Sequence, residues 1–153
     1  MRVVILDNLR SAWNVGSVFR TSAALKYDHI ALCGVTITPP SKKLKDTSRG
    51  MEDVVPWSSY LTTSEAVEYY KSRDYKVIAL ESNSNAKSIQ DWVVDEKVAW
   101  VLGNEANGVA PSILSLCDDA LELPMLSEQT GINVSCAFAA AAYQDFFMSK
   151  AND

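Results

Sequence analysis

Short apolar runs alternate with stretches of helical period along most of this chain. Five runs read as buried strands: 3–6, 30–35, 76–80, 98–102 and 120–123. Parallel strands need long crossover connections, and helices usually supply them. The alternation therefore predicts an α/β fold with a mostly parallel sheet flanked by helices on both faces.

The stretches between the strands carry recognisable helix signals. The first predicted helix buries one face, because small and apolar residues recur at i, i+3, i+4, i+7 and i+8: Val15, Val18, Phe19, Ser22 and Ala23. Thr62 and Glu65 form a capping-box pattern that opens a second helix running through Tyr70. Pro111 suits the first turn of a third, short helix. The Ala-rich range 133–148 predicts a fourth.

Length and composition limit the class of protein. With 153 residues and 48% apolar content, the chain can bury one sizeable core. It shows no charged leader and no apolar stretch of membrane length, so we expect a cytoplasmic protein that does not contact a membrane. Cys33, Cys117 and Cys136 lack disulfide or zinc spacing and are expected to be buried thiols, and the lone His29 has no ligand partner in sequence. No metal site is predicted.

Ligands of open parallel sheets bind outside the carboxyl ends of the strands. Three segments follow predicted strands there: Asn-Val-Gly-Ser-Val-Phe-Arg at 14–20, Leu-Gly-Asn-Glu-Ala-Asn-Gly at 102–108, and Leu-Pro-Met at 123–125 leading to Gly-Ile-Asn-Val-Ser at 131–135. None of them reads Gly-x-Gly-x-x-Gly, and Lys and Ser/Thr are missing after Gly108. These absences exclude a Rossmann dinucleotide site and a P-loop.

Taken together, the three segments resemble the signature motifs of the SpoU/TrmH branch of the SPOUT RNA methyltransferases. The resemblance covers nearly the whole chain and implies transfer of a methyl group from S-adenosylmethionine to a ribose 2′-hydroxyl of tRNA or rRNA, without a metal. It also implies a homodimer and a C-terminal deep trefoil knot, which general folding rules would not predict. The chain length then predicts a single SPOUT domain over 1–153 with no separate RNA-binding extension.

The resemblance assigns candidate catalytic residues in all three segments. From its sequence position, Asn14 is expected to cap its helix. Arg20, amid apolar residues, is either half of a salt bridge or the essential cation of similar enzymes. A guanidinium stays protonated, so we expect Arg20 to hold a phosphate and stabilise the developing alkoxide. Glu105 is either an exposed turn residue or a group that orients Asn14 or Arg20.

The third segment departs from the family pattern Ser-Leu-Asn-Val-Ser. Gly131 replaces the first serine, whose hydroxyl lies near the transfer site in the family; Thr130 is a candidate substitute. Losing one such contact costs on the order of 1 kcal/mol when solvent replaces it, and several times more when a buried partner is left unpaired. Asn133 and Ser135 remain as candidate catalytic residues.

The resemblance also assigns a set of cofactor-binding residues around the second and third segments. They are Leu80, Glu81, Leu102, Gly103, Asn104, Gly108, Leu123, Met125, Ile132 and Asn133. Gly103 and Gly108 can adopt positive φ at no steric cost, so the loop between them could wrap a flat adenine with main-chain groups.

The charge pattern bears on RNA binding in two ways. A net charge of −5 and a pI near 4.9 count against an RNA partner, because phosphate contacts usually need a basic surface. One loop bounded by Pro and Gly nevertheless gathers cations. With Arg20 of the first segment and Arg10 just before that segment, it gives the candidate RNA-binding set: Arg10, Arg20, Lys42, Lys43, Lys45 and Arg49. The alternative is a solvated loop. Among the tryptophans, only Trp13, beside the first segment, is a candidate for stacking on a base.

Two other functions stay open from the sequence. Because of Gly131, the chain could be a catalytically impaired SPOUT-fold module that binds RNA or assists assembly. Because of its acidity, it could be an S-adenosylmethionine-dependent enzyme with a substrate other than RNA. The small residues of the last helix suit close dimer packing, and they equally suit a buried core helix.

Overall fold

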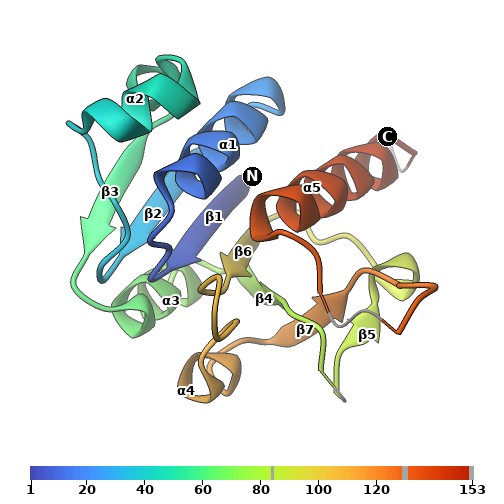
Figure 1. Ribbon diagram of the computed structural model, residues 1–153. Helices are drawn as coiled ribbons and strands as arrows, with labels where there is room; N and C mark the ends of the chain where they lie inside the picture. Colours follow the sequence, from blue (N-terminus) through green and yellow to red (C-terminus); the bar gives the residue numbers. More distant parts are fainter. Residues whose placement is uncertain (84, 129–130, 152–153) are drawn as a thin grey trace.

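The computed structural model describes residues 1–83, 85–128 and 131–151. Within them, seven parallel strands form one sheet in the order β3-β2-β1-β6-β4-β7-β5 (Figure 1). The strands are β1 Arg2–Asp7, β2 His29–Cys33, β3 Trp57–Tyr60, β4 Lys76–Leu80, β5 Lys87–Ser88, β6 Val98–Leu102 and β7 Asp119–Glu122. The predicted α/β class is confirmed.

Helices cover both faces of the sheet (Figure 1). They are α1 Ala12–Ala24, α2 Lys42–Ser48, α3 Thr63–Lys71, α4 Pro111–Leu114 and α5 Val134–Ala151, with 3₁₀ turns η1 Met51–Asp53 and η2 Ile89–Asp91. Successive residues of a strand point to opposite faces. Val4 of β1 accordingly shares one core with Phe19 and Phe138, whereas Val3 shares the other with Val67 of α3.

The N-termini of the helices confirm two of the predicted capping features and contradict one. Thr62 and Glu65 make the predicted capping box at α3, and Pro111 occupies the first turn of α4. The prediction that Asn14 caps α1 is wrong. Ser11 is the cap, because its hydroxyl accepts the N–H of Asn14, and this leaves the Asn14 amide free to bind elsewhere.

The basic segment predicted to be a loop is largely helical, so that prediction is wrong. Ser41 caps α2 by accepting the N–H of Leu44, and the Leu44 side chain is fully buried. Thr47 donates from its hydroxyl to the carbonyl of Ala12 at the start of α1. Lysine is a good helix former, and one apolar anchor is enough to hold this short helix against α1.

The sheet also extends beyond the strands predicted from the sequence. The two outer strands, β3 and β5, were not predicted, since neither carries a run of apolar residues. The predicted strand 30–35 ends earlier, at Cys33, because Gly34 turns the chain with φ of 61°. The strand order does not by itself establish the knot, which stays a prediction.

The described helices include none that is both long and apolar enough to cross a membrane. All three cysteines are free thiols. Cys33 is buried as expected, Cys117 is half-buried, and Cys136 is exposed, which corrects the prediction of three buried thiols. Cys136 is exposed because it lies on the outer face of α5.

Candidate active site

The three sequence segments meet at the carboxyl edge of the sheet, around the side chain of Asn14. Its Nδ2 donates to Glu105 Oε1 at 3.1 Å, and its Oδ1 accepts from Asn133 Nδ2 at 3.0 Å. Asn14 is only 4% exposed. A buried amide that is bonded on both sides fixes the relative positions of α1, the loop after β6 and the start of α5.

Glu105 ties that loop to the start of α1. Besides the amide of Asn14, its carboxylate accepts the backbone N–H groups of Arg10 at 3.2 Å and of Ser11 at 3.0 Å. Partial burial would raise the pKa of Glu105, but the hydrogen bonds from Asn14, Ser11 and Arg10 outweigh it, so the pKa is lowered. The carboxylate therefore stays ionised. The predicted contact with Asn14 is present.

Asn133 joins the cluster from the N-terminus of α5. Its Oδ1 accepts the N–H of Ser135 at 2.9 Å and that of Cys136 at 3.3 Å, the pattern of a helix cap. The Ser135 hydroxyl, which is buried, donates to the same oxygen at 2.6 Å. Ser135 thus holds Asn133 in place, and the Asn133 amide group is left to reach Asn14.

A hollow of about 300 Å³ lies beside this cluster, at the ends of β4, β6 and β7. Nine of the ten residues assigned to cofactor binding line it: Leu80, Glu81, Gly103, Asn104, Gly108, Leu123, Met125, Ile132 and Asn133. The exception is Leu102, whose side chain is buried in the core. The sequence analysis missed Ser82, Glu122, Val134 and Ala137 in the wall. Their positions at the strand ends and at the start of the last helix could have indicated that they line the site.

The two glycines of the second segment shape the wall of the hollow. A Cβ on Gly103 would lie 2.2 Å from the backbone of Gly108 and Val109, so Gly103 is needed for close packing and has no positive φ. Gly108 has φ of 67°, and a Cβ there would lie 2.3 Å from Glu81 Oε2. Asn104 and Gly108 exchange two backbone hydrogen bonds, of 3.0 and 2.8 Å. The result is a tight, flat wall of main-chain atoms.

Two further carboxylates accept hydrogen bonds at the strand ends. The sequence analysis predicted neither of these hydrogen bonds. Glu81 Oε2 accepts the backbone N–H of Val109 at 2.6 Å, which holds the second segment against β4. Glu122 Oε2 accepts from the Ser82 hydroxyl at 2.9 Å.

The space around Gly131 is open, because no atom of the neighbouring structure lies within 4 Å of where a Cβ would stand. A serine side chain would fit there, and Thr130, its candidate substitute, lies outside the described residues.

The structure does not bring Arg20 into the hydrogen-bonded cluster. Its side chain is exposed on α1, and among the described residues it has neither an ion pair nor a hydrogen bond. The alternative of a salt bridge at the sheet edge is therefore not supported. Within the described part of the chain, Arg20 presents an unpaired cation to solvent, on the helix that supplies Asn14.

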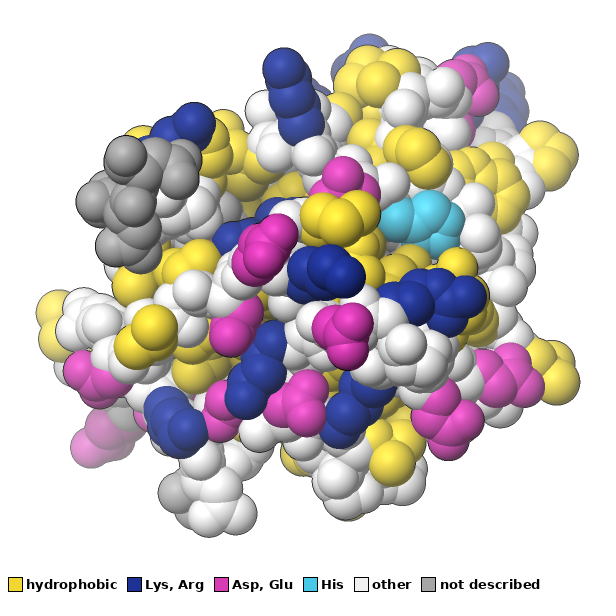
Figure 2. All heavy atoms as spheres, turned by 180° about the vertical axis from the view of Figure 1, so that it is seen from behind, with side chains coloured by type: hydrophobic (Ala, Val, Ile, Leu, Met, Phe, Trp, Pro, Cys, Tyr) yellow, Lys and Arg dark blue, Asp and Glu magenta, His cyan; other side chains and the backbone are white. Residues whose placement is uncertain are grey.

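The candidate RNA-binding cations all lie on the surface. Lys42, Lys43, Lys45 and Arg49 are exposed on and beside α2, and Arg10 is exposed just before α1. The ion pairs of the described residues use other cations: Arg2, Lys71, Lys76 and Lys87. Seen from behind, basic and acidic side chains are interspersed (Figure 2). That face offers no continuous basic surface for phosphates.

A metal centre finds no support in the described part of the chain, where no three His, Cys, Asp or Glu side chains gather closely enough to hold an ion. A parallel sheet with a hollow at its carboxyl edge and a fixed amide–carboxylate cluster beside it is the arrangement of α/β domains whose small-ligand sites lie at the strand ends. More specifically, the chain belongs to the SpoU rRNA Methylase family, whose model matches residues 1–143.

Curated relatives agree with this assignment. A TrmH family tRNA/rRNA methyltransferase of Staphylococcus aureus (strain COL) is 28% identical over 149 residues, which are 95% of this chain and 58% of that protein. A counterpart from Staphylococcus haemolyticus is 27% identical over 93% of this chain and 57% of its own length. The chain thus spans less than three fifths of the length of these relatives.

Solved structures share the fold. The AdoMet-bound rRNA methyltransferase of Sinorhizobium meliloti superposes with a TM-score of 0.87 at 19% identity, over 94% of this chain and 55% of that one. At this level of identity the likeness establishes the fold alone. The family model over residues 1–143 confirms the SpoU/TrmH assignment made from the three segments.

Proposed function

We propose that this chain is a methyltransferase that uses S-adenosylmethionine to methylate a ribose 2′-hydroxyl of tRNA or rRNA, working as a cytoplasmic homodimer. The observation that carries the proposal is the cluster of Asn14, Glu105 and Asn133. It unites the three family segments beside a hollow of suitable size. Family membership and the AdoMet-bound structural relative support it.

The hollow suits an adenosine-containing ligand. The backbone wall between Gly103 and Gly108 leaves no room for a side chain, and Leu80, Leu123 and Ile132 supply apolar surface. When bound, S-adenosylmethionine supplies an electrophilic methyl group on a sulfonium sulfur. Asn14, Glu105, Asn133 and Ser135 act as positioning residues, since each is committed to hydrogen bonds that fix the loops.

Arg20 acts on the RNA in this proposal. Its guanidinium cannot serve as a base, because an arginine side chain is not deprotonated in proteins. An unpaired, exposed guanidinium can form a bidentate contact with a phosphate and stabilise negative charge that develops on the 2′-oxygen. Arg10 and the cations on and beside α2, which are Lys42, Lys43, Lys45 and Arg49, contact neighbouring phosphates and offset the acidic net charge.

The dimer in this proposal packs through α5. Cys136, Ala140, Tyr143 and Phe147 recur at i, i+4, i+7 and i+11, and all four are exposed. Tyr143 is 43% and Phe147 61% exposed, whereas Ala141 and Ala142 on the other side are buried in the core. An apolar stripe on an otherwise well-packed helix suits a second copy of the same chain.

The test is transfer of labelled methyl from S-adenosylmethionine to unmodified bulk tRNA and, separately, to rRNA, followed by nucleoside analysis. We expect label on ribose 2′-oxygens with the wild type. Arg20→Ala should lose transfer but keep the wild-type affinity for S-adenosylmethionine, measured by calorimetry. Cofactor binding without transfer to either RNA would contradict the proposal.

Gly131 keeps a second function open, an RNA-binding or assembly module that has lost transfer. The space around Gly131 lets Gly131→Ser restore the family hydroxyl without a clash. An inactive wild type that becomes active in Gly131→Ser would favour the module. A third function, with a substrate other than RNA, would gain support if the wild type showed no salt-sensitive binding to either RNA.

A further inference from the structure

Trp13 is a large apolar side chain left in solvent. It is 68% exposed, whereas Trp92 is 7% exposed, Trp100 is fully buried and Trp57 is partly buried. Among the described residues, no aromatic ring or cation packs on its ring. Core packing, the ordinary role of tryptophan, therefore does not explain this residue.

Trp13 is the immediate neighbour of Asn14, a residue of the candidate active site. Trp13 is the second residue of α1 and directly precedes Asn14, which is bonded to Glu105 and Asn133. One residue along a helix is a turn of about 100°. Trp13 thus lies beside the cluster on the solvent side of the helix.

A shallow hollow of about 440 Å³ lies next to Arg10 and Ser11, the two residues that precede α1. Its lining residues come from the start of α1 and from the second segment: Arg10, Ser11, Asn104, Glu105, Ala106 and Asn107. The carboxylate of Glu105 is already committed to Arg10, Ser11 and Asn14. The exposed side chains of Arg10 and Asn107 remain to meet a ligand, and both can donate hydrogen bonds.

Exposed arginines lie on both sides of Trp13 along the chain. Arg10 precedes it, and Arg20 follows seven residues later, on nearly the same side of α1 and about 10 Å along the helix axis. An aromatic ring between cations is how proteins bind single-stranded nucleic acid, by stacking on bases and contacting phosphates. The charge around Trp13 therefore favours an RNA strand as its occupant.

We propose that Trp13 stacks on a base adjacent to the nucleotide that is methylated, with Arg10 on the neighbouring phosphate. This inference rests on the proposed function and extends it, because it gives the enzyme a contact that selects where the RNA strand lies. Stacking on an indole is tolerant of base identity, so Trp13 sets position and affinity, and it does not read sequence.

The experiment compares Trp13→Ala, Trp13→Phe and wild type, with unmodified bulk tRNA and rRNA as probes. Trp13→Ala should weaken binding of the accepting RNA by about tenfold or more, whereas Trp13→Phe keeps a ring and should stay within about threefold of wild type. RNA should quench tryptophan emission in the wild type, and most of that quenching should vanish in Trp13→Phe. S-adenosylmethionine affinity should be unchanged in both variants.

Tyr69→Ala is the matched control, because Tyr69 is an exposed aromatic on α3; it should leave RNA affinity unchanged. Unaltered RNA affinity in Trp13→Ala would overturn the inference. So would a shift of Trp13→Ala to monomers in light scattering, which would assign Trp13 to a subunit contact. Failure of the wild type to methylate either RNA would instead overturn the proposed function, and the quenching measurement would still test the stacking.

Discussion

Glu105 carries its charge into a loop where three donors converge on it. The donors are two backbone N–H groups and the side-chain amide of Asn14. Glutamine cannot replace Glu105, because the NH₂ group of its side chain is itself a donor and would face one of these donors. We expect Glu105→Gln to lower the methyl-transfer rate by about tenfold or more, since each unpaired donor is costly. Single-turnover transfer measures this.

The matched control for that change is Glu68→Gln on α3, where the side chain is exposed and away from the candidate site. It should transfer methyl groups at the wild-type rate. Wild-type transfer by Glu105→Gln would show that the position of Asn14 does not depend on the carboxylate.

His29 has a structural role, and it should make the stability of the folded state depend on pH. Its Nδ1 lies 2.6 Å from the Tyr70 hydroxyl and its Nε2 lies 3.0 Å from the Ser58 hydroxyl, so it links β2 to α3 and β3. Burial lowers the pKa of His29 below 6.5. The folded state thus disfavours the imidazolium, and stability should fall as the pH drops below about 6.5, the ordinary histidine value.

His29→Gln should flatten that part of the stability profile, measured by urea unfolding at pH values from 7.5 down to 5. The control is Tyr69→Phe, which leaves the histidine in place and should keep the wild-type slope. An identical slope in His29→Gln and wild type would assign the pH dependence to other groups.

Contacts between single residues were only partly predictable. The bond between Glu105 and Asn14 followed from the family segments, since a carboxylate in a tight loop needs donors. The capping role of Ser11 was missed because Ser11 and Asn14 are both good caps, and only the backbone geometry decides between them. The unpaired state of Arg20 depends on the surroundings of α1, which the local sequence does not contain.

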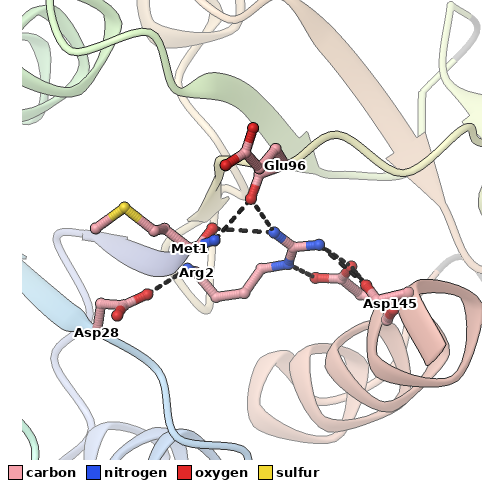
Figure 3. Close-up of polar contacts among 6 residues, drawn as sticks. Met1, Arg2, Asp28, Glu96 and Asp145 are labelled. Carbon is pink, nitrogen blue, oxygen red and sulfur yellow. Dashed lines mark hydrogen bonds and ion pairs between the residues drawn. The ribbon is translucent and has the colours of Figure 1, made fainter. Parts of the chain in front are cut away.

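At the scale of elements, α5 is held to the sheet at its far end by an ion pair. Arg2 Nε lies 2.5 Å from Asp145 Oδ2, and Arg2 Nη2 donates to Asp145 Oδ1 at 2.9 Å (Figure 3). The Asp145 side chain is 2% exposed. Asp145→Asn should lower the free energy of unfolding by about 3 kcal/mol, because it leaves the guanidinium without its buried counter-charge. Urea denaturation measures the loss.

Glu96→Gln controls for the local change in charge. Glu96 meets Arg2 and Met1 through its backbone carbonyl alone, as Figure 3 shows, so its side chain can change without touching those bonds. We expect wild-type stability in Glu96→Gln. Equal stability of Asp145→Asn and wild type would mean that desolvation of the pair cancels its attraction.

Elements with a strong apolar pattern were predictable, and those at the margins were not. The four central strands carry buried apolar runs, but β3 consists of Trp57-Ser58-Ser59-Tyr60 and forms because β2 offers it an open edge. Helix α2 has one buried apolar side chain, Leu44, and three lysines. Tertiary contacts decide such elements, so a local pattern cannot reveal them.

At the scale of the whole molecule, the exposed stripe on α5 predicts an assembly. Phe147→Glu places a charge among apolar side chains, and we expect it to convert the dimer to monomers in light scattering while the circular dichroism spectrum stays native. Glu68→Gln again serves as a surface control. A wild-type protein that is monomeric at micromolar concentration would contradict the proposed dimer.

The place of β1 in the middle of the sheet has a consequence for how the protein is made. Val3 pairs with His29 on one side and with Ala99 on the other. On the ribosome, the first neighbour emerges early, while β6 emerges only after the whole segment from β2 to β4 has been synthesised. Until then one edge of β1 is open and its apolar residues lack a lateral partner. The nascent chain therefore exposes an unpaired strand edge, which can pair with another chain, until β6 has been translated.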